Sequence, residues 1–385
     1  MPLKPNNKLF WVFALSSSVY FIQGIEGLPS QGLFYYLKET LHFSPKKIML
    51  FSSITTLAWL VKPLIGYLID NFLKKKVWIY LSLLLDIILV LILGLAALPI
   101  FLVIGFILLN STNAAFRDVS VDGIMCVEGK KYNATGKIQS VQWMSISLAG
   151  IITGILGGYI AYKWDYRMAF LWLIPFYLIA WLTAYLYKEE ASELKYKYLF
   201  RELKQLFMNK QLMWVCLFIF LYRYSPSFGT PLFFIQRDTF KWGKVWIGAL
   251  STISTACGIV GSLLYYKFST RLNLKKWLFW SVIIGALTTF SYLYYKPVTA
   301  VIYDTVYNFI GMFIFIMVLD VMAKSTVNGL EATSFALLTS VSNLALFSSN
   351  ISGAFLLPVI GLKWLIVISA LTSFLCLPLI KKIHT

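Results

Sequence analysis

The fold of this chain is decided by a charged stretch that interrupts a long apolar run, Phe116-Arg117-Asp118-Val119-Ser120-Val121-Asp122. The surrounding residues, from about Pro99 to Cys126, have the composition of a single apolar helix. Asp118 and Asp122 are four residues apart, so they share one helix face, and Arg117 lies beside them. Inside a bilayer each charge costs a few kcal/mol or more unless it pairs or faces water. We therefore expect the stretch to face a polar cavity. The alternative is a helix end at the headgroups, with the Arg117 side chain extended to water.

The composition predicts an all-α polytopic membrane protein. Hydrophobic residues make up 59% of the 385 residues and charged residues only 13%, whereas soluble domains contain about 25% charged residues. Apolar runs of about twenty residues recur along the chain, and each is long enough to cross a hydrocarbon core of about 30 Å. The net charge of +18 comes from bases scattered through short loops. Such bases indicate topology signals rather than nucleic-acid binding.

The apolar runs predict twelve transmembrane helices in two six-helix lobes. The N-terminal lobe covers residues 1–187, a cytoplasmic linker with an amphipathic helix covers 188–210, and the C-terminal lobe covers 211–385. Bases are about twice as frequent on the face that receives the N-terminus. Both termini are therefore expected in the cytoplasm, with the chain in the cell (inner) membrane. The spans are predicted at Lys8–Tyr36, Lys46–Asp70, Val77–Leu98, Pro99–Cys126, Tyr132–Ala161, Met168–Tyr187, Gln211–Arg237, Lys244–Thr270, Trp277–Tyr295, Ala300–Lys324, Gly329–Pro358 and Lys363–Leu379.

Ionisable residues fall within these spans at several depths. With a rise of 1.5 Å per residue, one group lies at the bilayer midplane or about 5–10 Å from it toward the inner face; it consists of Glu26, Asp86, Arg223, Lys62, Arg117 and Asp118. Asp304 lies nearer the outer surface. Because unpaired charges at such depth are costly, we expect ion pairs among them. The first pairing expected is Lys62 with Asp118 or Asp122.

A second motif, Gly66-Tyr-Leu-Ile-Asp70, ends the second span just before three lysines. A carboxylate at this place can accept hydrogen bonds from the exposed amides of a neighbouring helix N-terminus, where the macrodipole is positive. The eleventh span, which begins after Asn328-Gly329, is the neighbour that we expect. This contact would lock the lobes together on the inner side. The alternative is a plain capping carboxylate beside the lysines of the inner face.

The motif around Asp70 resembles a loop motif of the major facilitator superfamily. Five ordered patches over nearly the whole chain are similar to signatures of the folate–biopterin transporter family. They are Tyr20-Phe-Ile-Gln23-Gly24-Ile-Glu-Gly27-Leu, Trp59-Leu-Val-Lys62-Pro63-Leu-Ile-Gly66, Arg117-Asp118-Val-Ser-Val-Asp122, Ser225-Pro226-Ser-Phe, and Gly329-Leu-Glu331-Ala-Thr-Ser-Phe-Ala336 leading to Ser342-Asn343. Glu26 and Ala58 depart from the family's pattern, so the substrate preference stays open.

The resemblance implies a twelve-helix, two-lobed transporter with the major facilitator fold that moves folate or another pterin-type compound. We expect a monomeric secondary active transporter that works by alternating access across the bilayer. Two alternatives stay open, namely a carrier for another organic solute such as S-adenosylmethionine and a ligand receptor that does not transport. Proton symport is one expectation, with Glu26 or Asp122 as the group that takes the proton. The histidines, His42 and His384, lie in a loop and near the end of the chain, and no nucleophile–base pair is visible. We therefore expect no enzyme, no cofactor and no metal site.

The predicted substrate-binding residues are Gln23, Glu26, Trp59, Lys62, Arg117, Asp118, Asp122, Arg223 and Asn343, and the predicted gating residues are Gly66, Asp70 and Glu331. Asp118 or Asp122 would accept hydrogen bonds from the amino and amide edge of a pterin. The cationic residues of the set would hold folate carboxylates, the arginines through two parallel hydrogen bonds. Aromatic residues near them, Trp59, Tyr20, Tyr222 and Tyr224, would either stack on the ring or serve packing alone.

Overall fold

The computed structural model describes residues 5–43, 59, 61–190, 204 and 206–383. Every regular element in these ranges is helical. The chain separates into two compact units, Met1–Lys197 with Asn328–Ala336, and Tyr198–Val327 with Leu337–Thr385. The boundary between Ala336 and Leu337 falls inside a helix, so one helix belongs in part to each unit. Most of the predicted linker, residues 191–203 and 205, lies outside the described residues.

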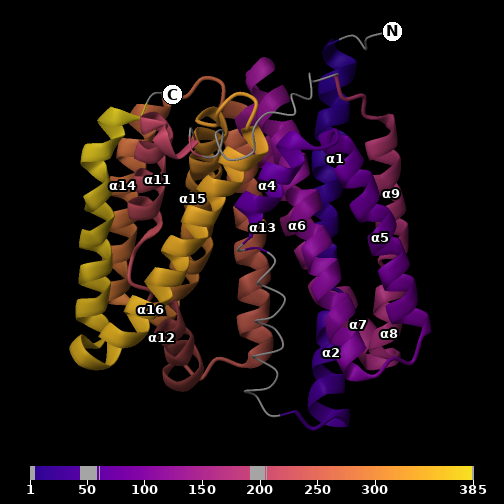
Figure 1. Cartoon of the computed structure of the whole chain (residues 1–385). Coiled ribbons are helices and arrows are strands. Elements are labelled where there is room, and N and C mark those ends of the chain that lie inside the picture. The colour runs from indigo at the N-terminus through magenta and orange to yellow at the C-terminus, as the bar shows by residue number, and fades with distance from the viewer. Residues whose placement is uncertain (1–4, 44–58, 60, 191–203, 205, 384–385) are drawn as a thin grey trace. The chain divides into compact units, whose positions relative to one another are not determined.

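The first unit is a bundle of helices (Figure 1). Most of the second predicted span, residues 46–58 and 60, lies outside the described residues. The elements are α1 (Pro5–Ile25), α2 (Ser30–Tyr35), the π-helix η1 (Tyr36–Thr40), α4 (Lys62–Asn71), α5 (Lys75–Leu95), α6 (Ile100–Lys131), α7 (Thr135–Lys163), α8 (Tyr166–Leu171) and α9 (Ile174–Leu186).

The second unit contains longer helices and several short irregular ones. They are α11 (Lys210–Arg223), α12 (Gly229–Phe234), the π-helix η2 (Ile235–Thr239), α13 (Lys244–Phe268), α14 (Leu274–Ser291), the 3₁₀ helix η3 (Tyr292–Tyr294), α15 (Pro297–Lys324), α16 (Glu331–Thr372) and the 3₁₀ helix η4 (Ser373–Lys382).

Local sequence signals place many of the helix starts. Asn209 and Asn273 cap α11 and α14, and their side-chain oxygens each accept a backbone N–H three residues on, at 3.1 Å. Asp165 accepts the backbone N–H of Arg167 at the start of α8, at 3.0 Å. Asparagine and aspartate suit this position because they satisfy an amide that has no partner inside the helix. Proline lies in the first turn of α4, α9 and α15, where its missing N–H leaves no hydrogen bond unmade.

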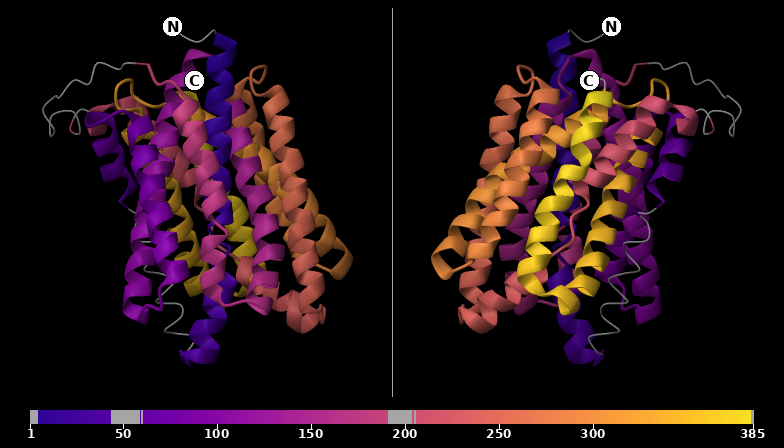
Figure 2. Two further views of the ribbon diagram at one scale, coloured as in Figure 1. Left: turned by 90° about the vertical axis from the view of Figure 1, so that its right-hand side faces the viewer. Right: turned by 90° about the vertical axis from the view of Figure 1, so that its left-hand side faces the viewer.

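Nine helical segments of the described residues are long and apolar enough to cross a membrane. The last of them, Glu331–Lys382, has 52 residues, which at 1.5 Å per residue is more than twice the length needed for one crossing. It contains Pro358, and Gly361 has the non-helical angles φ 74°, ψ 167°. Figure 1 and the right panel of Figure 2 show the chain reversing there, with two limbs. This segment therefore holds both the eleventh and the twelfth predicted spans.

The first predicted span, Lys8–Tyr36, is wrong as a single helix. Helix α1 ends at Ile25, and a turn precedes α2. Pro29 has no N–H, so the α-helical hydrogen-bond ladder is interrupted there. The sixth predicted span is likewise divided into α8 and α9, where Pro175 follows the turn.

Glycines allow close helix contacts within each unit. A Cβ at Gly24 of α1 would lie 2.6 Å from the carbonyl oxygen of Ile146 on α7. In the second unit, a Cβ at Gly261 of α13 would lie 2.3 Å from the carbonyl oxygen of Phe309 on α15. Both distances are shorter than any van der Waals contact, so only glycine permits these helix pairs to approach so closely.

The seventh predicted span, Gln211–Arg237, is also wrong as a continuous helix. It stops at Arg223 and resumes at Gly229, with Pro226 in the interruption. Unpaired backbone groups would be costly in a bilayer, and α16 supplies their partners. The backbone N–H of Ser227 donates to the carbonyl oxygen of Ser349 at 2.9 Å. The N–H of Ser225 donates to the Ser349 hydroxyl at 3.0 Å, and the Ser369 hydroxyl donates to the carbonyl oxygen of Pro226.

This interruption leads to a prediction for Gly353→Ala. A Cβ at Gly353 of α16 would lie 2.1 Å from the carbonyl oxygen of Ser227, so α16 must move away from the chain it supports. We expect a loss of about 1–3 kcal/mol of stability, as for an overpacked core, measured by thermal unfolding in detergent. Gly229→Ala is the control, because nothing lies within 4 Å of a Cβ at Gly229. Equal melting temperatures for the two variants would contradict this account.

Candidate functional site

Arg117 of α6 lies at the centre of a buried ion network in the first unit. Its side chain is 1% exposed. One terminal nitrogen of the guanidinium donates to Asp86 of α5, and the other donates to Glu26, just after α1. The guanidinium carbon is also 5.7 Å from the ring centre of Tyr177 on α9. A single side chain therefore joins four segments of the unit.

Neutral donors complete the coordination of both carboxylates. Asn110 and Asn113, two turns and one turn before Arg117 on α6, donate to Asp86 at 2.8 and 3.3 Å. The Tyr177 hydroxyl donates to Glu26 at 2.8 Å. Removing one member of a buried ion pair destabilises a protein by about 3–5 kcal/mol, because the other charge stays buried without a partner. Arg117 is thus fixed by charge and by hydrogen bonds together.

A second ion pair lies on the next face of α6. The ammonium of Lys62, the first residue of α4, is 2.6 Å from Asp118, so the predicted pairing of Lys62 with Asp118 is confirmed. The same ammonium lies 4.4 Å from the ring centre of Trp59. Arg117 and Asp118 are neighbours in sequence but about 100° apart around the helix. They therefore serve different ion pairs.

Asp122 lies one turn beyond Asp118 and has a different environment. It is 4% exposed. The Tyr20 hydroxyl of α1 donates to it at 2.8 Å, and the Gln142 amide of α7 donates at 3.3 Å. Among the side chains that the structure describes, no cation lies within 4.0 Å of Asp122. It is a buried carboxylate held by neutral groups.

The network contains more carboxylates than cations. Lys62 and Arg117 are opposed by four carboxylates, Glu26, Asp86, Asp118 and Asp122. With all six ionised, the network would carry a net charge of −2. Excess charge of one sign is costly in a low-dielectric interior. This arrangement favours the binding of a proton or of a ligand that brings donors or positive charge.

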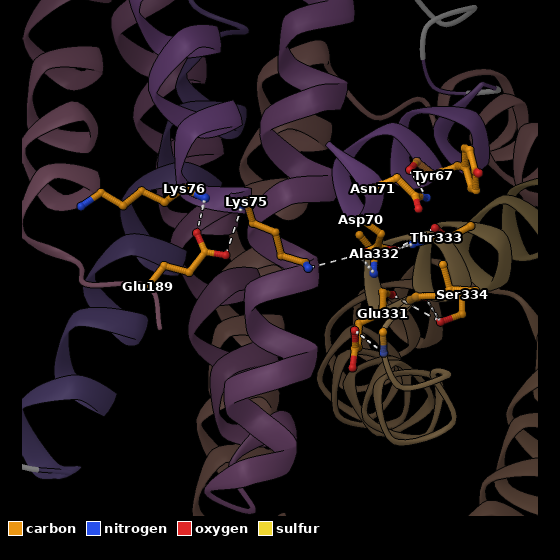
Figure 3. A network of polar contacts seen from close by, with 12 residues as sticks. Tyr67, Asp70, Asn71, Lys75, Lys76, Glu189, Glu331, Ala332, Thr333 and Ser334 are labelled. Atoms are coloured by element: carbon orange, nitrogen blue, oxygen red, sulfur yellow. Dashed lines mark hydrogen bonds and ion pairs between the residues drawn. The ribbon is translucent and has the colours of Figure 1, made fainter. Parts of the chain in front are cut away.

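Asp70 makes the predicted contact with the start of the eleventh span (Figure 3). Its carboxylate accepts the backbone N–H groups of Thr333 at 2.7 Å and Ala332 at 3.3 Å, and the Thr333 hydroxyl at 2.8 Å. The Lys75 ammonium lies 3.1 Å from the same carboxylate. These contacts hold the first turn of α16, which continues as part of the second unit. We call this group of contacts the Asp70 clamp.

Gly66 and Glu331 shape the clamp from either side. A Cβ at Gly66 would lie 2.8 Å from the carbonyl oxygen of Ala332 and 2.9 Å from the amide nitrogen of Thr333. Only glycine therefore allows α4 to lie against the first turn of α16. Glu331 accepts the backbone N–H of Gly329 at 3.0 Å and so fixes the turn that precedes the helix. Whether these residues act in gating stays a prediction.

A further set of ion pairs joins three segments that were predicted at the inner face. Lys8 pairs with Glu128 at 2.6 Å and with Glu190 at 2.7 Å, and Lys131 pairs with Glu190 at 3.0 Å. Hydrogen bonds from Lys8 and Lys131 hold the pKa of the Glu190 carboxyl below its ordinary value. Glu189 accepts the backbone N–H groups of Lys75 and Lys76 at the start of α5 (Figure 3).

Two predicted site residues belong to the second unit. Arg223 ends α11, and its guanidinium carbon lies 5.2 Å from the ring centre of Phe315. Its buried Nε has no partner, and no side chain that the structure describes accepts from this guanidinium. It lines a cavity of about 200 Å³ together with Tyr222 and Phe315. Asn343 of α16 is exposed.

The structure thus joins most of the predicted set within one unit: Glu26, Trp59, Lys62, Arg117, Asp118 and Asp122. Gln23 is half-buried nearby in sequence, and its side-chain oxygen has no partner among the described residues. The predicted set omitted Asp86, Asn110 and Tyr177. Asn110 and Asn113 precede Arg117 at helical spacing. This spacing could have predicted that the polar face of α6 continues toward its N-terminus.

Comparisons with known proteins identify the family of the chain. The profile of the BT1 family matches residues 23–385. A folate-biopterin transporter of Synechocystis is 26% identical over 96% of this chain and 81% of its own length. Folate transporter 1 of Plasmodium falciparum is 23% identical over 87% of this chain and 70% of its own length.

Solved structures show the same fold. The human organic anion transporter MFSD10 (TETRAN) superimposes with a TM-score of 0.74 at 13% identity, covering 98% of this chain and 100% of that chain. The Major Facilitator Superfamily transporter FucP of E. coli has a TM-score of 0.73 at 14% identity, covering 97% of this chain and 99% of that chain. The predicted all-α major facilitator fold is therefore confirmed, and so is the expectation of a transporter rather than an enzyme. The chain belongs to the BT1 family, that of the folate–biopterin transporters.

Proposed function

We propose that this protein is a secondary active transporter that moves folate or a related pterin compound across the membrane by alternating access. Family membership and the fold support a transporter. The observation that carries the substrate class is the guanidinium of Arg223. This group lies in a cavity beside an aromatic ring and has no acceptor among the described side chains. A permanent cation at that depth needs an anionic partner, and a ligand carboxylate matches the two parallel donors of arginine.

In this proposal the ion network of the first unit responds to the ligand and to protons. Asp122 is the group that we favour for proton uptake, because its partners are neutral donors and no described cation pairs with it. Glu26 is the second choice, since it accepts from both Arg117 and Tyr177. Binding of a proton would reduce the excess negative charge of the network. This supports proton symport as the source of energy.

The Asp70 clamp belongs to one of the two alternating conformations. It holds the start of α16 through a carboxylate and two backbone amides, and all three gating residues, Gly66, Asp70 and Glu331, take part. Transport would require the clamp to break and reform in each cycle. We further propose a monomer in the cell (inner) membrane with both termini in the cytoplasm. The distribution of Lys and Arg along the sequence supports this orientation.

One alternative cargo has a specific observation in its favour. S-adenosylmethionine carries a sulfonium cation, and the excess of carboxylates around Arg117 and Lys62 would favour a cationic ligand. A receptor that binds without transport is the other alternative. Both can be separated from folate transport in a single reconstituted system.

The test is counterflow in proteoliposomes that contain the purified protein. Vesicles loaded with unlabelled folate should take up external radiolabelled folate faster than empty vesicles, because a carrier exchanges ligand across the bilayer. An acidic exterior should increase the initial rate of net uptake if protons move with the substrate. Stimulation by internal S-adenosylmethionine instead of folate would contradict the proposed cargo. Folate binding without counterflow would contradict transport itself.

The clamp gives a second prediction. Asp70→Asn removes the charge that faces Lys75 and one of the two oxygens that accept amide N–H groups. We expect the maximal transport rate to fall about tenfold, because charged hydrogen bonds contribute about 1.5–3 kcal/mol, while KM stays within about twofold. Asp165→Asn is the control, since asparagine also caps a helix N-terminus well. An unchanged maximal rate in Asp70→Asn would remove the clamp from the mechanism.

A further inference from the structure

The second unit contains a larger cavity that no predicted site residue lines. Its volume is about 610 Å³, within the range of about 300–1,000 Å³ that small-molecule sites occupy. It lies among α13, α15 and the short helices η2 and η3. The residues that matter for the argument are Gln236, Ser251, Tyr292, Tyr303, Asp304 and Tyr307.

Tyrosine rings form one wall of this cavity, which we call the tyrosine cavity. Tyr303 and Tyr307, one turn apart on α15, stack with their ring centres 5.1 Å apart and their planes within 5°. Tyr292 packs edge-on against both, at 5.4 and 5.5 Å. The Tyr307 hydroxyl also forms a hydrogen bond with the Ser291 hydroxyl. Rings that hold each other in this way offer a rigid aromatic surface, with little entropy to lose when a flat ligand binds.

Asp304 lies next to this wall and has a carboxylate oxygen that accepts no hydrogen bond from the described residues. Its Oδ2 accepts from the Gln236 amide at 2.9 Å, and the same amide nitrogen donates to the Tyr295 hydroxyl at 2.7 Å. Among the side chains that the structure describes, no cation pairs with Asp304, and its Oδ1 has no donor. An ionised carboxylate on a membrane-spanning helix needs donors, and a carboxylate can accept up to four hydrogen bonds. A ligand with two adjacent N–H groups would supply them.

The remaining polar lining indicates that the cavity is open to water rather than to lipid. Ser251 of α13 and Asn308 of α15 are exposed and line it, and the buried hydroxyl of Ser254 has no partner among the described residues. Exposed polar groups on membrane-spanning helices face water-filled spaces rather than hydrocarbon. A polar solute could therefore enter.

This cavity is adjacent to the one that Arg223 lines. The two share Tyr307 and Gly311 of α15, and Gly311 has no side chain to separate them. A carboxylate acceptor and an aromatic wall thus lie on one side of Tyr307, and an unpaired guanidinium lies on the other. The two cavities are complementary to a molecule with a donor-bearing flat ring at one end and a carboxylate at the other.

We propose that the tyrosine cavity binds the planar heteroaromatic end of the substrate. Asp304 accepts the two N–H groups of a 2-amino-4-oxo-pyrimidine edge, the tyrosine wall contacts the ring face, and Arg223 holds the carboxylate tail. This inference rests on the proposed function and deepens it. It assigns the ring-binding site to Asp304 in the second unit instead of Asp118 or Asp122 in the first.

The test uses three probes that divide the substrate: 6-methylpterin, which has the ring and no carboxylate; p-aminobenzoylglutamate, which has the carboxylates and no pterin; and folate. Affinities are measured by titration calorimetry on the purified full chain. Asp304→Asn should weaken 6-methylpterin about tenfold or more, because the loss involves hydrogen bonds to a charged group, and leave p-aminobenzoylglutamate unchanged. Arg223→Gln should give the reverse pattern. Both should weaken folate.

Each variant carries its own folding control, since it should still bind one of the two fragments normally. Asp238→Asn provides a matched charge control, because Asp238 is an exposed carboxylate of η2 and does not line the cavity. Tyr303→Leu should weaken 6-methylpterin and spare p-aminobenzoylglutamate. Unchanged 6-methylpterin affinity in Asp304→Asn, with normal folate binding by the unaltered chain, would overturn this inference alone. If the unaltered chain bound neither folate nor 6-methylpterin, the proposed cargo would be overturned as well.

Discussion

Arg117 brings a permanent positive charge into the core of the first unit, and the surrounding helices are arranged to compensate it. Asp86 comes from α5, Glu26 from the turn after α1, and Tyr177 from α9, so the charge can be neutralised only when these elements pack around α6. In a medium of low dielectric constant an unpaired guanidinium is far more costly than an exposed one. This constraint couples the packing of the unit to its ionisation. Lys62 and Asp118 compensate each other's buried charge in the same way on the next face of α6.

The same constraint connects the core to the elements that would move. Asp118 and Asp122 share the helix with Arg117, and Lys62 begins α4, whose other end carries Asp70. Asp70 in turn holds the first turn of α16, a helix that continues into the second unit. Helix α4, of 10 residues, thus connects the ion network at its first residue with the Asp70 clamp near its last. The second unit contains two ionisable side chains with atoms that lack a partner among the described residues, Arg223 and one oxygen of Asp304.

Sequence reasoning predicted the features that depend on charge and missed those that depend on three-dimensional packing. The pairing of Lys62 with Asp118 and the contact of Asp70 with the start of α16 followed from the cost of buried charge and from helix-end amides. The role of Asp86 as a partner of Arg117 could not be predicted in this way, because no periodicity shows which faces of α5 and α6 meet. The interruption after Arg223 was missed although Pro226 was visible, because the partners of its backbone groups are more than 100 residues away on α16. The tyrosine cavity was missed because a run of tyrosines in a span is usually packing.

The carboxylates of Asp86 and Glu26 hold Arg117 in the core of the first unit. Thermal unfolding of three purified proteins gives the sharpest test of this arrangement. Arg117→Met should lower the melting temperature strongly, by an amount equivalent to about 3–5 kcal/mol, since Asp86 and Glu26 would stay buried without a cation. The triple variant Arg117→Met, Asp86→Asn, Glu26→Gln should recover most of that loss relative to the unaltered chain. A single variant as stable as the unaltered chain, or a triple variant no more stable than the single one, would contradict the account.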